Sequence, residues 1–210
     1  MVAPILSGIE TTLMISIISA VLATAIGILT AMGTKTAWKP LALMGKTYVE
    51  LFRNTPLLIQ LFFFYKGLPY FGIVLSPIVC GMLALSLQSG AYLCEIFRAG
   101  LETIPREQMD SGLSLGFSKW QTYFSIMLPQ ALPVVIPPMG NQMISLLKNS
   151  SLVAFITVPD LFFVIYSQSA AHFEYLTFFT MGIFIYVLLN LGITQLFRMV
   201  EKWAVKKIYV

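Results

Sequence analysis

Residues 110–130 read "DSGLSLGFSKWQTYFSIMLPQ", a polar stretch broken by Gly112 and Gly116 that lies between two apolar runs. The chain around it is unusually apolar. Of its 210 residues, 58% are hydrophobic and 10% are charged, and the mean hydropathy is +0.84. Because a soluble domain carries about 25% charged residues, so few charges cannot cover a soluble surface. The composition predicts an all-α, polytopic membrane protein in which this stretch is the exception.

The beginning of the stretch predicts a short helix. Pro105 suits a first helical turn, and Glu107 and Asp110 follow where the helix dipole favours anions. Gly116 is placed as the glycine that ends this helix.

A second helix is expected directly afterwards. Ser118 and Gln121 have the spacing of a capping box, and Pro129 is expected to end this second helix. The chain should therefore form a helix, a tight corner at residues 116–118 and another helix.

Five segments are candidates for spanning a membrane, which takes about 20 mostly apolar residues. They form one membrane domain over residues 1–210, with a loop at roughly residues 102–128. The second candidate contains Glu50 and Arg53, which are expected to pair with each other. Residues 54–56, Asn-Thr-Pro, predict a local irregularity in this candidate. The five candidates are residues 11–34, 41–65, 67–94, 120–147 and 175–197.

The basic residues indicate the orientation. With the N-terminus outside, ten Lys and Arg residues fall in the inner segments and two in the outer segments, a strong positive-inside bias. The C-terminus and the 102–128 loop are therefore predicted to be cytoplasmic. The inner residues are Lys35, Lys39, Lys46, Arg98, Arg106, Lys119, Arg198, Lys202, Lys206 and Lys207, and the outer ones are Lys66 and Lys148.

The predicted corner has an apolar edge. Met109, Leu113 and Gly116 lie on one side at i, i+4 and i+7, and Leu115 and Phe117 follow near the end of the helix. Such an edge can lie flat on the membrane or in the groove of a partner. The spacing does not decide between the two.

Two spans carry residues that predict special packing. Ala23, Gly27 and Ala31 form a small-residue face that allows close helix contact, within the chain or between subunits.

The prolines of the fourth span predict a bend or break, with the regular part starting near residues 133–138. This makes the segment a candidate lining of a pathway, with a kink that serves packing alone as the alternative. The prolines are Pro129, Pro133, Pro137 and Pro138.

The segment after Lys148 is too interrupted to span a membrane. Asp160 follows a proline and begins an apolar run, which predicts a turn and a half-embedded outer helix. His172 should lie near the outer surface, and no set of residues has the spacing of metal ligands.

The stretch at residues 110–130 resembles the "EAA" loop of ABC importer permeases. That pattern is Glu-Ala-Ala, three residues, Gly, nine residues and Ile-x-Leu-Pro, and Gly116, Ile126, Leu128 and Pro129 match it in spacing. Residues 110–112, Asp-Ser-Gly, stand in place of Glu-Ala-Ala. Three further segments resemble the polar amino acid branch of the family: "YVELFRNTPLLIQLFFFYKGLP" (48–69), "SGAYLCEIFRAGLETIP" (89–105) and "LLKNSSLVAFITVPDL" (146–161).

The resemblance implies a type I ABC importer permease fold in the cytoplasmic (inner) membrane. Two permease subunits would form the pathway, and an extracytoplasmic binding protein would deliver a polar amino acid. Two ATPase subunits would hold ATP and Mg²⁺, so this chain would bind no cofactor and would not itself be an enzyme. They would dock on a coupling helix with Asp110, Ser111, Gly112, Leu113, Leu115, Gly116 and Phe117.

Polar residues at membrane depth are the candidates for binding the solute, because ionisable groups are costly there. Arg98 and Lys148 could bind the carboxylate of an amino acid, and Glu95 or Gln88 its ammonium group. In the alternative interpretation, Glu95 and Arg98 form an internal ion pair and Lys148 is an interface charge. The candidates are Gln88, Tyr92, Glu95 and Arg98 in the third span and Gln142, Lys148 and Asn149 near the end of the fourth.

An ion-gradient-driven secondary transporter without an ATPase partner is the alternative function. It predicts inverted repeats and a buried ion relay, and the sequence displays neither. Residues 40–47 come nearest to a phosphate loop, but Pro40 stands where the first glycine should be. No catalytic constellation is present, and no basic stripe favours nucleic acid as a partner.

Overall fold

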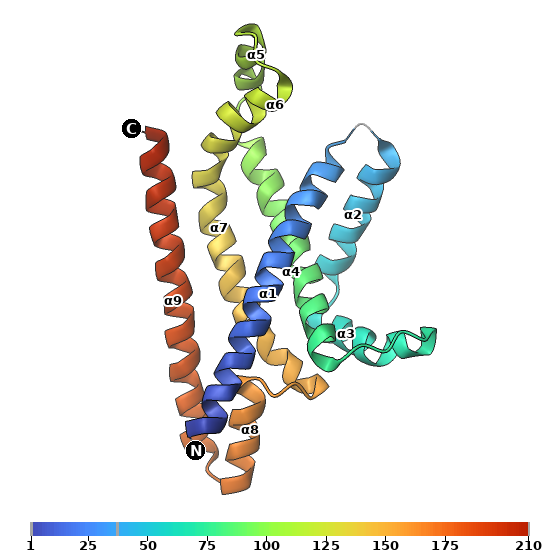
Figure 1. Ribbon diagram of the computed structural model, residues 1–210, viewed down its shortest axis with the longest axis vertical. Coiled ribbons are helices and arrows are strands. Elements are labelled where there is room, and N and C mark those ends of the chain that lie inside the picture. Colours follow the sequence, from blue (N-terminus) through green and yellow to red (C-terminus); the bar gives the residue numbers. More distant parts are fainter. Residues whose placement is uncertain (1, 37, 210) are drawn as a thin grey trace.

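The computed structural model describes residues 2–36 and 38–209, and every regular element in that part of the chain is a helix. In chain order these are α1 (Val2–Thr34), α2 (Lys39–Asn54), α3 (Leu57–Phe62), η1 (Phe63–Gly67), η2 (Leu68–Phe71), α4 (Pro77–Glu102), α5 (Glu107–Ser114), α6 (Lys119–Thr122), η3 (Tyr123–Met127), α7 (Leu128–Asn149), η4 (Ser150–Ile156), α8 (Leu161–His172) and α9 (Tyr175–Tyr209). The α5–α6 corner and the end of α9 lie at one end of the molecule, and the N-terminus and α8 lie at the other (Figure 1).

Helices α1 and α4 form the most extensive contact between elements. Ala23, Gly27 and Ala31 are buried, and a Cβ on Gly27 would lie 2.8 Å from the Cβ of Leu93 on α4. Only glycine lets the two backbones approach this closely. The small-residue face therefore packs within the chain, which is one of the two outcomes that the sequence allows.

Three helices in the described part of the chain are long and apolar enough to cross a membrane: Ala3–Thr34, Pro77–Glu102 and Tyr175–Lys206. A fourth span results if Lys119–Ile156 and Leu161–His172, which meet at an angle of 54°, count as one bent span. The expected total of five is thus not confirmed, because the second candidate is divided into shorter helices.

The division of the second candidate lies at Thr55 and Pro56. Helix α2 ends at Asn54, the backbone of Thr55 is extended (φ −109°, ψ 139°), and α3 begins at Leu57. Proline has no N–H for a helical bond and forces the preceding residue out of the helical region. The candidate span over residues 41–65 is therefore divided at residues 54–56, where the sequence predicts a local irregularity.

The third span begins later than the sequence suggests, at Pro77, and continues to Glu102. Helix η2 ends at Gly72, which adopts a left-handed conformation (φ 78°). A short connection without regular structure then leads to α4. Ser76 then caps α4, since its Oγ accepts a bond from the N–H of Val79 at 3.4 Å. Proline suits the first position of a helix, where its missing N–H costs nothing.

The fourth span runs through its prolines without a break, and Pro129 does not end the helix that starts after Ser118. The expected end at Pro129 and the expected break are therefore wrong, while a bend of the span stays a prediction. At Pro129 the structure shows a physical reason. The carbonyl that Pro129 would meet belongs to Ser125, four residues earlier, and the wider π-helical turn η3 contains it. Such a turn absorbs the misfit. Pro133, Pro137 and Pro138 then lie inside α7.

The outer helix that follows α7 is confirmed as α8. Asp160 caps it, because its Oδ1 accepts a bond from the N–H of Phe163 at 2.9 Å. His172 is exposed at the end of α8 and stacks on Phe178, with the ring centroids 5.8 Å apart. At this end of the molecule, α8 packs against both α1 and α9.

Candidate functional site

The corner formed by α5 and α6 has the local structure that its sequence predicts. Helix α5 ends at Ser114, and Gly116 adopts φ 84° with no atom placed where its Cβ would be. Its role is therefore conformational, since most other residues are strained there. The capping box of α6 is complete: the Ser118 N–H donates to Gln121 Oε1 at 2.8 Å, and the Gln121 N–H donates to Ser118 Oγ at 3.3 Å. Pro105 lies just before the helix, which starts at Glu107.

The two arms of the corner are in direct contact at Gly112 and Thr122. Gly112 and Thr122 are both buried, and a Cβ on Gly112 would lie 2.6 Å from Thr122 Oγ1. The Thr122 hydroxyl itself donates to the Ser118 carbonyl at 3.1 Å. Since Gly112 leaves no space between the arms, they form one rigid unit.

The corner exposes apolar side chains together with the polar Asp110 and Ser111. Gly112 is the only buried member of the predicted docking set, and the other six members are exposed. Leu115 is 74% exposed, and Trp120 on α6 is 63% exposed. The corner projects beyond the ends of the long helices (Figure 1). The set is Asp110, Ser111, Gly112, Leu113, Leu115, Gly116 and Phe117.

A second site lies where α2 breaks, because side chains of α4 bind the freed carbonyls there. Gln88 Nε2 donates to the Thr55 carbonyl and the Tyr92 hydroxyl donates to the Arg53 carbonyl, both at 3.4 Å. Gln60 Nε2 donates to the Phe52 carbonyl at 3.0 Å and to the Thr55 side chain at 2.7 Å. Backbone groups at membrane depth need such partners, which gives Gln88 and Tyr92 a structural role.

Glu95 lies between two arginines beside this break. It forms a two-pronged pair with Arg98 at 2.8 and 3.0 Å and a contact with Arg53 Nη1 at 3.4 Å. The expected pair of Glu50 and Arg53 is wrong, because Arg53 turns to α4 and Glu50 bonds Asn54 Nδ2 at 2.8 Å. The internal Glu95–Arg98 pair, one of the two interpretations left open, is present.

The ion-pair network continues to the end of the helices. Arg98 Nη1 contacts Glu102 at 2.9 Å, and Lys35, the residue after α1, lies 3.8 Å from the same carboxylate. The side chains of Arg53, Glu95 and Arg98 keep 30–38% of their surface exposed. The described residues thus cover these three side chains only in part.

The candidate binding residues of α7 are Gln142, Lys148 and Asn149. Along the helix axes, they lie at other heights than Arg98 of α4. Gly100 of α4 packs against Val135 and Gly81 against Val153, which fixes an antiparallel register. Arg98 is therefore level with the middle of α7, and Lys148 lies about 16 Å further along the axis. One carboxylate cannot contact both cations. Gln142 is near the level of Tyr92, and Lys148 and Asn149 lie at the far end of α7.

The sequence missed some of these partners. Gln60 was not singled out, although an amide four residues after a proline break is a signal for a cap. Thr122 gave no signal, because its contact with Gly112 depends on the angle between two helices.

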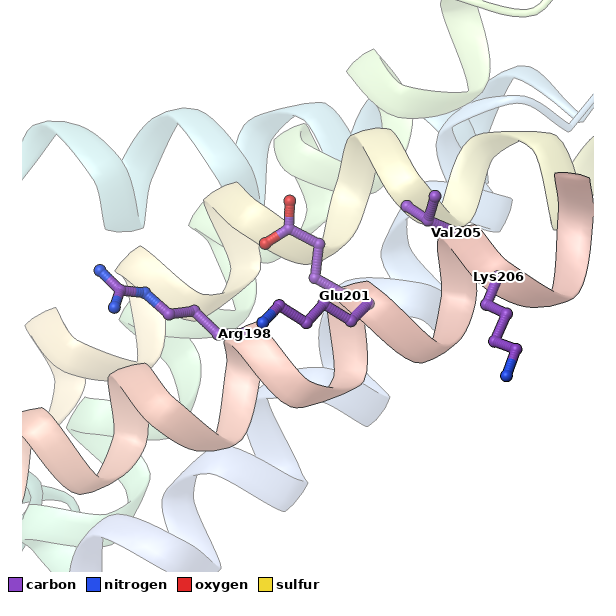
Figure 2. A pocket seen from close by; sticks show the side chains of 5 residues that line it. Arg198, Glu201, Val205 and Lys206 are labelled. Carbon is purple, nitrogen blue, oxygen red and sulfur yellow. The ribbon is translucent and has the colours of Figure 1, made fainter.

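The end of α9 gathers basic side chains at the same end of the molecule as the corner. Arg198, Lys202 and Lys206 are exposed and surround a shallow hollow of about 350 Å³ together with Glu201 and Val205. Figure 2 shows Glu201 pointing toward α7 and Lys206 pointing away from it. This basic end agrees with the charge bias on which the predicted orientation rests.

The arrangement of a protruding corner between two membrane helices is matched by known proteins. The family model described as "Binding-protein-dependent transport system inner membrane component" matches residues 23–206. This chain belongs to that family. The permease is also similar to curated relatives that are named as amino acid transporters.

Three of these relatives cover most of both chains. The probable amino-acid ABC transporter permease protein YckA of Bacillus subtilis is 35% identical over 87% of this permease and 80% of its own length. The probable glutamine ABC transporter permease protein GlnM of the same organism is 34% identical over 94% and 93%. The histidine/lysine/arginine/ornithine permease protein HisM of Escherichia coli is 30% identical over 93% and 87%.

Solved structures share the fold of the permease. A chain of an amino acid ABC transporter crystallised with histidines has a TM-score of 0.88 at 29% identity and covers 95% of this chain and 94% of its own. A chain of the MetNI methionine ABC transporter has a TM-score of 0.77 at 16% identity, with 95% of both chains covered. The permease therefore has the fold of an ABC importer membrane subunit, and its family places it in the inner membrane.

Proposed function

We propose that this permease is the membrane subunit of an ATP-driven importer that carries a polar amino acid across the cytoplasmic membrane. The observation that carries the proposal is the α5–α6 corner, which is rigid inside and exposes apolar side chains. Exposed apolar side chains on a corner that projects from the bundle fit the groove of a protein partner better than a membrane surface. Family membership and the names of the relatives support the same function.

The rigidity of the corner suits the transmission of force from an ATPase. The Gly112–Thr122 contact and the capping box prevent α5 from moving independently of α6. Because α6, η3 and α7 follow one another without a gap, a displacement of α5 reaches α7 directly. Closure of two ATPase subunits on ATP and Mg²⁺ would thus turn the membrane helices, and hydrolysis would reset them.

The other partners follow from the same assignment. A second permease subunit, either a copy of this chain or a sister chain, would cover the partly exposed side chains of Arg53, Glu95 and Arg98. An extracytoplasmic binding protein would deliver the amino acid to the end that carries α8. The N-terminus is then outside and the C-terminus inside, and residues 1–210 act as one membrane domain.

The predicted binding residues fit a path better than a single pocket. An amino acid entering from the outer end would meet Lys148 and Asn149 first, pass Gln142, and reach Arg98 about 16 Å deeper. Arg98 would hold its carboxylate, while Glu95, Gln88 and Tyr92 lie within the same face of α4. The ion-gradient alternative gains no support from YckA and GlnM, which are both named as probable ABC transporter permease proteins.

The proposal is tested on the permease reconstituted in nanodiscs with its cognate ATPase and binding protein. ATP hydrolysis should rise when the amino-acid-loaded binding protein is added. Leu115→Ser should weaken ATPase binding by about tenfold, since burial of a leucine side chain contributes about 1.5–3 kcal/mol. Leu176→Ser is the matched control, because Leu176 is 85% exposed at the opposite end of the molecule.

Two results would contradict the proposal. Amino acid uptake into vesicles that contain no ATPase would exclude ATP-driven import. Equal ATPase affinity for the Leu115 and Leu176 variants would exclude the corner as the docking surface.

A further inference from the structure

A group of buried oxygen atoms without hydrogen-bond partners lies near the outer end, far from the corner and the ion pairs. Each atom is almost completely shielded, and none forms a hydrogen bond with another protein group. Buried polar groups are nearly always paired, with protein or with ordered water. The four atoms are Ser16 Oγ, Asp160 Oδ2, Tyr186 OH and Asn190 Oδ1.

Asp160 is the charged member of the group and is completely buried. Its Oδ1 caps α8 through the Phe163 N–H, so only Oδ2 is unpaired. The next residue, Leu161, donates its N–H to Thr12 Oγ1 at 3.0 Å, which ties the start of α8 to α1. Asp160 forms no ion pair with the described residues.

The register of α1 and α9 brings the remaining atoms to the same level. Ile5 and Phe178 belong to one hydrophobic cluster, and Ala20 and Ile193 belong to a second cluster further along both helices. The two helices therefore run parallel, with Ser16 level with Asn190. Thr12 and Tyr186 lie one turn nearer the outer end on each helix.

The four atoms have a donor and acceptor balance that one molecule can complete. Asp160 Oδ2 and Asn190 Oδ1 can only accept, since Asn190 Nδ2 already donates to the Tyr186 carbonyl at 2.7 Å. The hydroxyls of Ser16 and Tyr186 can each donate one bond. A water molecule donates two hydrogen bonds and accepts two.

We propose that an ordered water molecule binds between α1, the start of α8 and α9, held by Ser16, Asp160, Tyr186 and Asn190. A sodium ion fits the site less well, because it would leave the protons of both buried hydroxyls without an acceptor. Water bridges span distances that direct bonds cannot. The bound water therefore fastens the outer turn before α8 to the two long helices.

A double-mutant cycle on the full-length permease in nanodiscs tests the site. Ser16→Ala and Tyr186→Phe each remove one bond to the water and almost no volume. Each should lower the Tm by about 2–6 °C. The double variant should lower it by clearly less than the two shifts together, because the second loss weakens a water that is already poorly held. This coupling would link two residues that do not bond each other.

Ser19→Ala is the matched control. Ser19 is equally buried on α1, but its Oγ has a direct partner in the Met82 carbonyl at 3.4 Å. Its Tm shift should add to that of Tyr186→Phe. Additive shifts for Ser16 and Tyr186 as well would overturn the proposal.

Two further measurements complete the test. A density map that resolves ordered water should show one peak within hydrogen-bond distance of all four atoms. A direct bond between Tyr186 and Asp160, with no peak between them, would overturn the proposal. So would a Tm that rises with Na⁺ but not with choline at equal ionic strength, because the ligand would then be a cation.

Discussion

Gly112 of α5 lies directly against Thr122 of α6, so that a Cβ on Gly112 would be 2.6 Å from the threonine Oγ1. The resemblance to the family pattern concerns α5 and the residues that follow it, and it places alanine where Gly112 stands. The structure gives the reason for glycine here: the β-branched side chain of Thr122 occupies the space that an alanine methyl group would need. The pair decides how closely the two arms of the corner approach.

Gly112→Ala should therefore separate the arms and weaken ATPase binding. Overpacking a closed contact costs about 1–3 kcal/mol, which corresponds to about a tenfold loss of affinity in a pull-down or calorimetric titration. Thr122→Ala in the same chain should restore most of this affinity, since it removes the two closest side-chain atoms. If the double variant binds no better than Gly112→Ala alone, the contact does not set the geometry of the corner.

Gly116→Val should damage coupling through the backbone and not through a clash. Gly116 has φ 84° and open space around its missing Cβ, while Gly192 of α9 also has open space but no positive φ. A left-handed conformation costs an ordinary residue about 1–2 kcal/mol. Gly116→Val should thus lower ATPase stimulation by the binding protein several-fold, whereas Gly192→Val should retain it. Equal activity of both variants would speak against a conformational role.

Glu95→Gln should loosen the contact between α2 and α4. The carboxylate neutralises Arg53 and Arg98 at the same time, and its loss leaves two cations side by side in a partly covered site. We expect a lower Tm in nanodiscs. Glu50→Gln is the control on α2, because Glu50 bonds only Asn54 and should have a smaller effect. A Tm shift at Glu50 as large as that at Glu95 would refute the ion-pair assignment.

Gln60 and Gln88, whose side chains bind carbonyls at the α2–α3 break, should contribute unequally to stability because their hydrogen bonds differ in number and length. Gln60→Leu removes the donor to the Phe52 and Thr55 carbonyls, whereas Gln88→Leu removes a single bond of 3.4 Å. An unpaired buried carbonyl costs about 1–3 kcal/mol. Thermal unfolding should therefore show the larger loss for Gln60→Leu, and the reverse order would mean that Gln88 holds the break together.

Arg98 and Lys148 should act independently on the amino acid. If Arg98 binds the carboxylate, Arg98→Gln should weaken amino acid binding to the membrane domain by about tenfold or more, because a charged hydrogen bond contributes about 1.5–3 kcal/mol. Lys148→Gln should lower the rate of uptake, and the two effects should multiply because the residues lie about 16 Å apart. Unchanged affinity of Arg98→Gln in calorimetry would remove Arg98 from the path.

The corner could be predicted from the sequence because each of its features is local. Gly116 ends a helix through its own φ, and Ser118 and Gln121 are three residues apart. The outer helix at Asp160 follows from the same kind of short-range cap. The membrane class and the all-α fold followed from composition, since so apolar a chain must satisfy its backbone within helices.

Other features depended on contacts between distant parts of the chain. The sequence pairs Arg53 with Glu50 on the same helix, but the approach of α4 offers Glu95 instead. The prolines of α7 suggest a break, yet the helix continues through Pro133, Pro137 and Pro138. At Pro129 the π-helical turn ahead of it absorbs the misfit.

By itself, then, the sequence determined where helices start and stop at caps and glycines, and that lipid is the solvent. The tertiary structure alone decided which charges meet, why glycine stands opposite Thr122, and which buried oxygens share one level of α1 and α9. The physical reason is the distance along the chain over which each kind of interaction acts. Caps and turns act over a few bonded neighbours, whereas ion pairs and close packing depend on helix registers that no single segment specifies.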